Sequence, residues 1–463
     1  MPSSLLRAQL RLLLREPALR IGALTLLLCL GYALARGRAW AHEEADRATA
    51  VQRDAEAAIA DKRDEVAALA DGRLRLDERP FAGSPFDYRV AAILPVGPLA
   101  ALAVGQRDLS PVVAEISLRG RRDNLLARRP LADPEQLQTG RFDAAFVVVY
   151  LLPLLVIGLC FDLLAGERER GTLRLVLSQP VGASTYLRAK LAARLLVLLA
   201  LLGSFGAAAV LTLGTGADAA LLAWLAVAAV HVAFWAALAF AVNARRRSAA
   251  TNAMHMVAAW VVLVLLLPAA INVVVEQALP LPSRMVLIGE LRAAENRAAA
   301  HVHDHPELTG DDALAWARRY YLVQRKIEEE TAPRFAGFEE RIAARAELVR
   351  AASLLSPAVL VHDALSELAG TGPTRHAAFA AQVRGFADAV HAELSPRLFA
   401  GRRLASHEYD GLPRFTFAEE APAALAARLM PPLLLLLAVT AGLMFWGDRR
   451  LRRGDLLMEE SER

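Results

Sequence analysis

The sequence predicts an all-α membrane protein with six transmembrane helices and two large, mostly helical extracytoplasmic segments. Three observations lead to this fold class. Hydrophobic residues make up 55% of the 463-residue chain, above the roughly 45–50% of an average soluble protein. They gather in six long apolar stretches. Charged residues still make up 22%, so a large part of the chain must lie in water.

The composition and the missing motifs exclude several kinds of protein. The formal net charge is only +4 and the arginines are scattered, which does not favour a nucleic-acid partner. Cys29 and Cys160 both lie in apolar stretches, so they form neither a disulfide framework nor a metal cage. The sequence has no G-x-x-x-x-G-K-[ST], no H-E-x-x-H and no G-x-S-x-G. We therefore expect no enzyme activity and no cofactor in this chain.

The first 36 residues predict a cytoplasmic amphipathic N-terminus (1–20) followed by a first transmembrane helix (21–36). Leucines and arginines are interspersed in the N-terminal part. The apolar stretch is shorter than the roughly 17–25 residues of a crossing helix, so Arg20 and Arg36 must extend to the membrane surfaces. A cleavable signal peptide is the alternative, because a basic start, a short apolar core and a final Ala-Leu-Ala are typical of one.

Five further stretches are apolar and long enough to cross a membrane. They are residues 143–164, 191–213, 219–242, 253–275 and 424–447.

The arginines between and after these helices predict the orientation. Three of them, Arg245, Arg246 and Arg247, lie in the short connection 243–252, and four more lie in the tail 448–463. The connection 214–218 has no lysine or arginine. The positive-inside rule then places both termini in the cytoplasm. We expect a multi-pass protein of a bacterial cytoplasmic (inner) membrane, in contact with membrane lipid.

This orientation places the two long segments, 37–142 and 276–423, outside the cytoplasm. The first opens with an alanine-rich, charged stretch, Glu43–Leu69, which has a helical composition. Prolines and glycines after it predict a more irregular part. In the second segment, Asp311–Arg350 predicts one or two long helices with Asp311 or Asp312 as N-cap, and Ala377–Leu394 predicts another.

Histidines supply two further candidates. His231 lies in the middle of the fourth predicted span, where ionisable groups are functional candidates; the alternative is a neutral imidazole bonded to a neighbouring helix. His301, His303 and His305 alternate in the sequence HVHDHPEL and are candidate metal ligands. We expect no metal ion there, because proline and acids follow at once and indicate a solvated helix end.

The connection 165–190 is the most ordered polar stretch of the chain. It begins with ERERGTLRLVLSQP at Glu167. The preceding helix can continue to Arg170 and end at Gly171, which tolerates a positive φ, and Thr172 can cap a short helix. That helix carries Leu173, Leu175, Val176 and Leu177. Such an apolar stripe must be buried against the membrane surface or a partner; the alternative is a plain stop-transfer signal with solvated charges.

ERERGTLRLVLSQPVGASTYLRAKL resembles the cytoplasmic signature of ABC-2 type ABC transporter permeases, in which E-x-E-x-G-T-L precedes a short apolar run, a proline and a lysine. Five other sequences resemble a subgroup often labelled as multi-copper enzyme maturation permeases. They are GRFDAAFVVVYLLPLLVIGLCFDLLAGERERGTLRL, LPVGPLAALAVGQRDLSPVV, HPEL, LLSPAVLVHDALSELAGTG and PRFTF. Such permeases have six spans, which supports a retained first helix.

The resemblance implies a role for seven residues of the connection. Glu167 and Glu169 would be its acidic pair, and Gly171 and Thr172 the hinge and cap of a coupling helix. The docking face for an ABC ATPase subunit would be formed by Leu173, Leu175 and Val176. The ATP and Mg²⁺ would then be bound by that subunit, and a second permease, either a second copy or a sister protein, would complete the complex.

Two other functions stay open at this stage. The complex could use ATP to act on a periplasmic client, for example in metalloenzyme maturation, without moving a solute. The two long segments favour this, since they far exceed the usual connection of roughly 4–6 residues. The other function is a membrane scaffold that has no ATPase partner.

Overall fold

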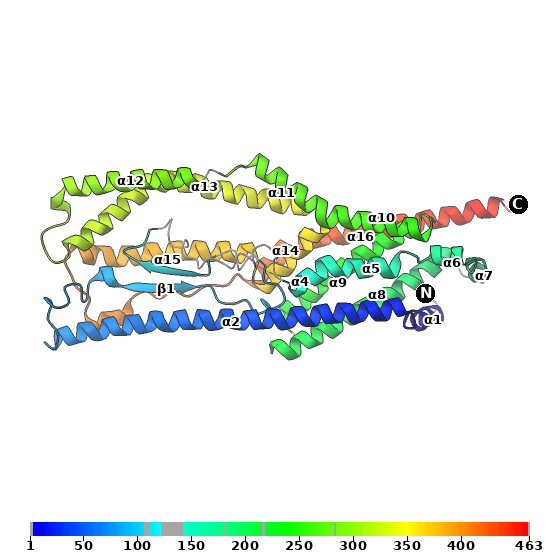
Figure 1. Cartoon of the computed structure of the whole chain (residues 1–463), viewed down its shortest axis with the longest axis horizontal. Coiled ribbons are helices and arrows are strands. Elements are labelled where there is room, and N and C mark those ends of the chain that lie inside the picture. Colours follow the sequence, from blue (N-terminus) through cyan, green and yellow to red (C-terminus); the bar gives the residue numbers. More distant parts are fainter. Residues whose placement is uncertain are drawn as a thin grey trace.

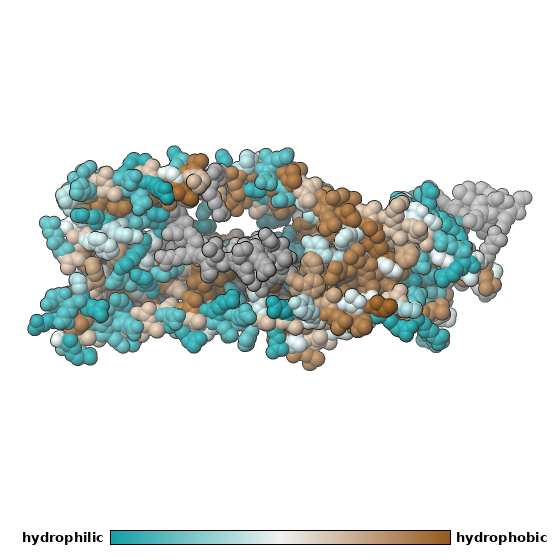
Figure 2. All heavy atoms as spheres, viewed as in Figure 1, coloured by the Kyte–Doolittle hydropathy of each residue, from teal (hydrophilic) through white to brown (hydrophobic). Residues whose placement is uncertain are grey.

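The computed structural model describes residues 3–105, 111–121, 142–178, 182–214, 218–281 and 284–461. The molecule is long and narrow, with apolar helices at one end and a polar half at the other (Figure 1). Both chain ends lie at the apolar end. A band of hydrophobic surface lies between two hydrophilic ends (Figure 2), which is the surface expected of a protein that crosses a bilayer.

Six helices of the described chain are long and apolar enough to cross a membrane, which confirms the predicted fold class. They are Pro17–Ala70, Ala144–Glu169, Ala183–Leu213, Ala219–Asn243, Ala249–Ala278 and Pro422–Arg452.

The first of these, α2 (Pro17–Ala70), joins the two halves of the molecule. It follows the short helix α1 (Ser3–Leu13) and begins with a proline at its first position, where the missing N–H costs nothing. The sequence predicts a boundary at residue 36, but α2 continues through it to Ala70. Ala and Arg around this boundary favour a helix, and Gly37 does not end it, because its missing side chain admits the backbone of Ala101.

The second and fifth spans each contain a wider π turn just before a proline. The second span consists of α4 (Ala144–Phe146), η3 (Val147–Leu151), α5 (Leu152–Cys160) and, after a turn, α6 (Ala165–Glu169). The fifth consists of α10 (Ala249–Trp260), η4 (Val261–Leu266) and α11 (Leu267–Ala278). A proline removes one helical hydrogen bond, and π turns are a common way for a helix to absorb such a defect.

The fifth span shows how a side chain replaces the lost bond. In η4 the N–H of Leu267 donates to the Val262 carbonyl five residues earlier. The next bond in this register would start at Pro268, which has no N–H. The hydroxyl of Ser356 donates to the orphaned Leu263 carbonyl instead, at 2.9 Å. Because Ser356 also caps α14 (Pro357–Ala369), this hydrogen bond ties the span to that helix.

The helix α9 (Ala219–Asn243) lies at the centre of the apolar end. It contacts α5, α8 (Ala183–Leu213), α14 and α16 (Pro422–Ser461). Two tryptophans of α9, Trp224 and Trp235, are fully buried. The helix α14 belongs to the same core through Leu360, Val361 and Leu365. It therefore closes the end of the bundle that faces the polar half.

The polar half has a separate core formed by α2, a two-stranded sheet and two long helices, and a third helix packs against one of them in a smaller apolar cluster. The strands β1 (Arg89–Ile93) and β2 (Val113–Ser117) are antiparallel. The helices are α12 (Arg284–Asp304), α13 (Ala315–Ser353) and α15 (Pro373–Phe399). The sequence predicts α13 and α15 but not the strands, whose five residues each give no clear alternation.

The N-cap predicted at Asp311 or Asp312 is wrong, because α13 begins at Ala315 and its N-cap position is Leu314, which forms no side-chain cap. Asp312 nevertheless serves this helix end: its carboxylate accepts the N–H of Leu314 at 2.9 Å and pairs with Arg318 at 2.9 Å. Arg318 holds the pKa of the Asp312 carboxyl below its usual value.

Candidate functional site

The candidate site lies at the apolar end of the molecule, where α5 stops and the connection to α8 begins. The chain turns between Phe161 and Leu164, so some carbonyls of the α5 end lose their helical partners. Side chains of two other helices take their place. Lys190 Nζ donates to the Leu163 carbonyl at 2.8 Å, Arg194 Nε donates to the Leu159 carbonyl, and Asn243 Nδ2 donates to the Cys160 carbonyl at 2.8 Å.

These donors fix the end of α5 to α8 and α9. Lys190, Arg194 and Asn243 are all buried, so they are surrounded by few competing waters and each lost hydrogen bond would leave a buried polar group unsatisfied. A movement of the connection that follows α5 must therefore move α8 and α9 with it or break these bonds.

The short helix α6 ends in the backbone motif that the sequence predicts at Gly171. Gly171 has φ +73°. Its N–H donates to the Arg168 carbonyl at 3.1 Å, and the N–H of Thr172 donates to the Glu167 carbonyl at 3.0 Å. This pair of hydrogen bonds is the Schellman arrangement. The Thr172 hydroxyl also donates to the Glu167 carbonyl, so Thr172 closes α6 directly before α7 (Leu173–Leu177) begins.

Glu167 is part of a buried ion pair within the chain. Its Oε1 accepts from Lys190 Nζ at 2.8 Å and from the Tyr186 hydroxyl. The side chains of Glu167 and Lys190 are only 15% and 9% exposed. The carboxylate of Glu167 therefore binds α6 to the start of α8 rather than presenting a charge on the surface.

Glu169 binds the same segment to the fifth span. Its Oε1 accepts the N–H of Ala249 at 2.8 Å, at the N-terminus of α10. A carboxylate is favoured there by the free N–H groups and by the helix dipole. Arg168, between the two glutamates, donates to the carbonyl of Arg246 in the connection before α10. The two predicted acidic residues thus have different partners, because Glu167 is bonded to α8 and Glu169 to α10.

The apolar residues of α7 do not all face the same way. Leu173 and Val176 are half-buried against the main core, whereas the side chain of Leu175 is 72% exposed. Leu173 and Val176 attach α7 to the bundle. Among the α7 side chains that the structure describes, Leu175 is the apolar one that is exposed to a membrane surface or another protein.

His231 lies on α9 and is fully buried. Its Nε2 is 3.4 Å from the carbonyl of Val149 and 3.2 Å from the indole Nε1 of Trp235. Nε2 either donates to Val149 or accepts from Trp235, depending on the tautomer. The structure thus gives His231 hydrogen-bond partners on its own and a neighbouring helix, next to the π turn of the second span.

The histidines of the polar half lie on the surface near the end of α12. The rings of His301 and His305 are 4.8 Å apart, and His303 is exposed. His305 Nδ1 faces Glu307 Oε1 at 2.9 Å. A hydrogen bond from its own backbone N–H, and then this contact with His305, lower the pKa of the Glu307 carboxyl. Within the described ranges, no three His, Cys, Asp or Glu residues are grouped so as to hold a metal ion.

Arg194 and Asn243 are absent from the residues that the sequence singles out, and Lys190 is predicted there only as the lysine of the motif that begins at Glu167. Arg194 could have been found, because it lies inside the third predicted span and an ionisable residue there is a functional candidate. Asn243 gives a weaker signal, since it stands at the very end of the fourth span.

Comparison with known proteins adds one match. Residues 292–418 match the sequence model of a family described as Domain of unknown function (DUF3526). This range covers most of α12, all of α13, α14 and α15, and the segment before α16, so it lies mainly in the polar half. No curated protein matches the chain.

Proposed function

We propose that the chain is the membrane-spanning permease subunit of an ABC-2 type ABC transporter, driven by a separate ATPase subunit through α7. The resemblance of the 25-residue stretch from Glu167 motivates the proposal. The observation that carries it is the surface of α7, where Leu175 is 72% exposed while Leu173 and Val176 attach the helix to the bundle. A partner that binds Leu175 would thereby contact a helix fixed to the spans.

The contacts of α6 supply a route from this surface to the spans. Glu167 binds α8, Glu169 binds α10, and the carbonyls at the end of α5 bind α8 and α9. A push on α7 would therefore act on four helices at once. In this proposal, ATP and Mg²⁺ are bound by the partner, and the two states of the complex differ in these contacts.

The same proposal fixes the orientation. The two termini and α7 lie at one end of the molecule (Figure 1). The connection with Arg245, Arg246 and Arg247 lies beside α6, because Arg168 donates to the Arg246 carbonyl. The positive-inside rule makes this end cytoplasmic, in the cytoplasmic membrane of a bacterium. A second permease, a copy or a sister protein, would complete the transporter. The polar half would then lie outside the cytoplasm.

A second function, action on an extracytoplasmic client, is favoured by the hydrogen bonds that connect the apolar end to the polar half. The Thr371 hydroxyl, just after α14, donates to the Ala103 carbonyl at 2.9 Å, and Asp143, just before the second span, accepts the N–H of Val104 at 2.8 Å. Movements of the spans are thus connected to the polar half. An ATP-coupled complex that acts on an extracytoplasmic client, without solute transport, would use such a joint.

The test is purification of the tagged protein in mild detergent from its own cell, with mass spectrometry of the proteins that accompany it. We expect a P-loop ATPase, and we expect Leu175→Glu to reduce its amount at least about tenfold, as for a residue central to an interface. The control is Leu308→Glu, because Leu308 is 45% exposed in the polar half. Equal ATPase in both variants would contradict docking at α7, and a chain that purifies alone would favour the scaffold.

A further inference from the structure

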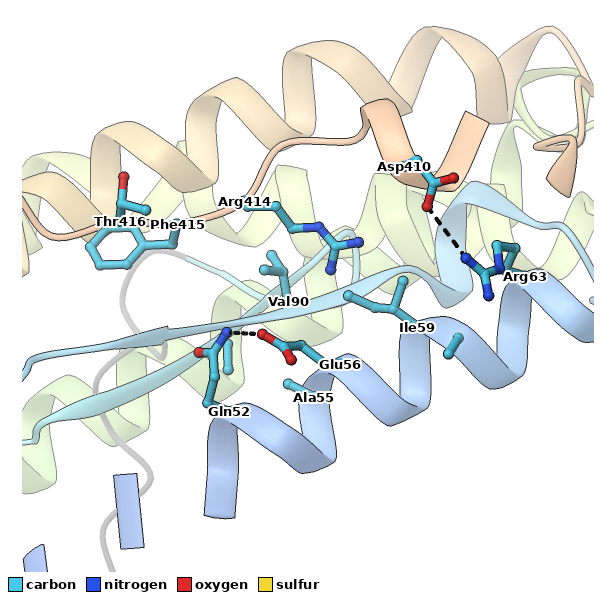
Figure 3. A pocket seen from close by; sticks show the side chains of 12 residues that line it. Gln52, Ala55, Glu56, Ile59, Arg63, Val90, Asp410, Arg414, Phe415 and Thr416 are labelled. Carbon is cyan, nitrogen blue, oxygen red and sulfur yellow. Dashed lines mark hydrogen bonds and ion pairs between the residues drawn. The ribbon is translucent and has the colours of Figure 1, made fainter. Parts of the chain in front are cut away.

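The polar half contains an open groove whose charges balance. It lies between α2, β1 and the segment that follows η6 (Ser406–Gly411). Figure 3 shows four charged side chains in its lining, Glu56, Arg63, Asp410 and Arg414. Arg63 pairs with Asp410 at 3.5 Å, and the carboxylate of Glu56 offsets the charge of Arg414. The groove therefore has no excess charge that would select a ligand, whereas a group of arginines at the apolar end does.

These arginines lie where the apolar surface of α16 stops. The 19 residues between Arg428 and Asp448 contain no charged side chain. In a helix they extend over about 28 Å, close to the roughly 30 Å of a bilayer's hydrocarbon core. Trp446, at the end of this stretch, is 40% exposed. A tryptophan in this position is typical of the level of the lipid headgroups.

Two arginines from separate parts of the chain lie over the ring of Trp446. The guanidinium carbon of Arg245, in the connection before α10, is 5.6 Å from the ring centre, and that of Arg450 is 5.5 Å from it. The face of the ring attracts each cation. The two cations repel each other, however, because they carry the same charge. An anion beside the ring would relieve this repulsion.

The carboxylates of this region do not supply that anion. Asp448 pairs with Arg452 at 2.8 Å and with Arg188 at 3.6 Å. The connection 243–252 and residues 446–452 together contain six arginines and one carboxylate, so adding Glu169 at the N-terminus of α10 still leaves an excess of cations. Among the described residues, neither Arg245 nor Arg450 forms an ion pair.

The turn that carries Arg245 is fixed against α16. The guanidinium of Arg246 donates to the Leu451 carbonyl at 3.3 Å, and the carbonyl of Arg246 accepts from Arg168. Arg246 has φ +55°, a conformation that is uncommon for residues other than glycine. These two contacts hold the turn in that conformation, and Arg245 is thereby placed over the Trp446 ring in advance of any ligand.

We propose that Arg245, Trp446 and Arg450 bind the phosphate group of an anionic phospholipid. Guanidinium groups form strong, charge-assisted hydrogen bonds with phosphate oxygens. A free phosphate ion has the same chemistry, but the exposed apolar surface of α16, including Phe445 at 66% exposure, favours a ligand with acyl chains. The site uses neither α7 nor an ATPase. Only its assignment to the cytoplasmic leaflet rests on the orientation in the proposed function.

The test is native mass spectrometry of the full chain in detergent, titrated with phosphatidylglycerol or with phosphatidylcholine of the same acyl chains. Phosphatidylcholine contains the same phosphate but no net charge, so we expect phosphatidylglycerol to bind more tightly. Arg245→Gln combined with Arg450→Gln should weaken the binding of phosphatidylglycerol about tenfold or more. The matched control is Arg7→Gln combined with Arg11→Gln, which removes the same charge from exposed positions of α1 at the same end of the molecule (Figure 1).

Three results would overturn the proposal. The two lipids could bind the unaltered chain with equal affinity, which needs no variant to observe. The control pair could weaken phosphatidylglycerol as much as the Arg245 and Arg450 pair, which would indicate a general attraction to the basic end. Millimolar inorganic phosphate could displace phosphatidylglycerol, which would assign the site to a free anion. Arg245 and Arg450 are exposed, so folding should be intact, and equal thermal unfolding curves of the two double variants check this.

Discussion

The ion pair between Glu167 and Lys190 should make a large contribution to the stability of the apolar end. Lys190 Nζ is 2.8 Å from Glu167 Oε1 and 2.8 Å from the Leu163 carbonyl. Lys190→Met removes both contacts. It leaves the Glu167 carboxylate buried with the Tyr186 hydroxyl as its remaining described partner, and it leaves the Leu163 carbonyl without its donor.

The expected loss follows from the burial of the pair. Breaking a buried ion pair by removing one partner costs about 3–5 kcal/mol, because the other charge stays buried and uncompensated. Glu167 keeps 15% of its side-chain surface exposed, so we expect a loss of about 3 kcal/mol. Glu167→Gln in the same chain removes that charge. The double variant should therefore be more stable than the sum of the two single losses predicts, by about 2 kcal/mol.

The assay is a double-mutant cycle on the free energy of unfolding. The purified chain is unfolded in mixed micelles with increasing sodium dodecyl sulfate and followed by tryptophan fluorescence. The control cycle uses Glu347 and Arg350, which pair at 2.7 Å on α13 but are 68% and 55% exposed. Exposed pairs of this kind contribute about 0.2–1 kcal/mol. A coupling energy for Glu167 and Lys190 no larger than that of the control would refute the reasoning.

Three other predictions concern single positions, and unfolding free energies test each. Gly37→Ala should destabilise the protein by about 1–3 kcal/mol, because the new Cβ would lie 1.9 Å from the carbonyl oxygen of Ala101. The control is Gly31→Ala on the same helix, where the new Cβ meets open space and should stabilise the protein by up to about 1 kcal/mol. Equal effects of the two substitutions would contradict the close packing of α2 against Ala101. Gly171→Ala should cost about 1–2 kcal/mol through its positive φ alone, since nothing lies within 4 Å of the added Cβ; no loss would exclude the Schellman turn. Burial raises the pKa of Tyr409 to about 12 from 10.0, so the stability that its neutral phenol contributes is complete below pH 10 and is lost as pH rises toward 12. A Tyr409→Phe variant should therefore lose less free energy of unfolding between pH 10 and pH 12 than the unaltered protein does. An equal loss in both proteins would count against a buried phenol.

Five of the six spans could be predicted because each is a long apolar run, and lipid leaves few alternatives to a helix. The first apolar stretch is shorter, and its retention as a span was supported by the family resemblance. The junction at residue 36 could not be predicted in the same way. Gly37 is as typical of a helix end as of a close helix contact, and only the position of Ala101 decides between them. The strands β1 and β2 could not be predicted, because five residues each are too few to show a clear alternation of apolar and polar side chains.

In the candidate site, the helix end at Gly171 could be predicted from the sequence, whereas the hydrogen-bond partners of the side chains could not. Gly171 stands at a helix end with positive φ, as its place after a charged run indicates. The partners of Glu167 and Glu169 depend on how α8 and α10 pack against α6, which local sequence does not determine. Docking through Leu173 and Val176 stays a prediction, although their half-buried positions leave Leu175 as the more accessible residue.

The most direct test of the proposed function is a cross-link from position 175 in the living cell. A photo-reactive amino acid replaces Leu175, and the same residue at position 308 is the control. The account predicts an adduct between position 175 and a P-loop ATPase, identified by mass spectrometry, and none from position 308. Adducts with lipid alone at position 175, in a chain that is inserted at normal abundance, would contradict the claim that α7 docks an ATPase.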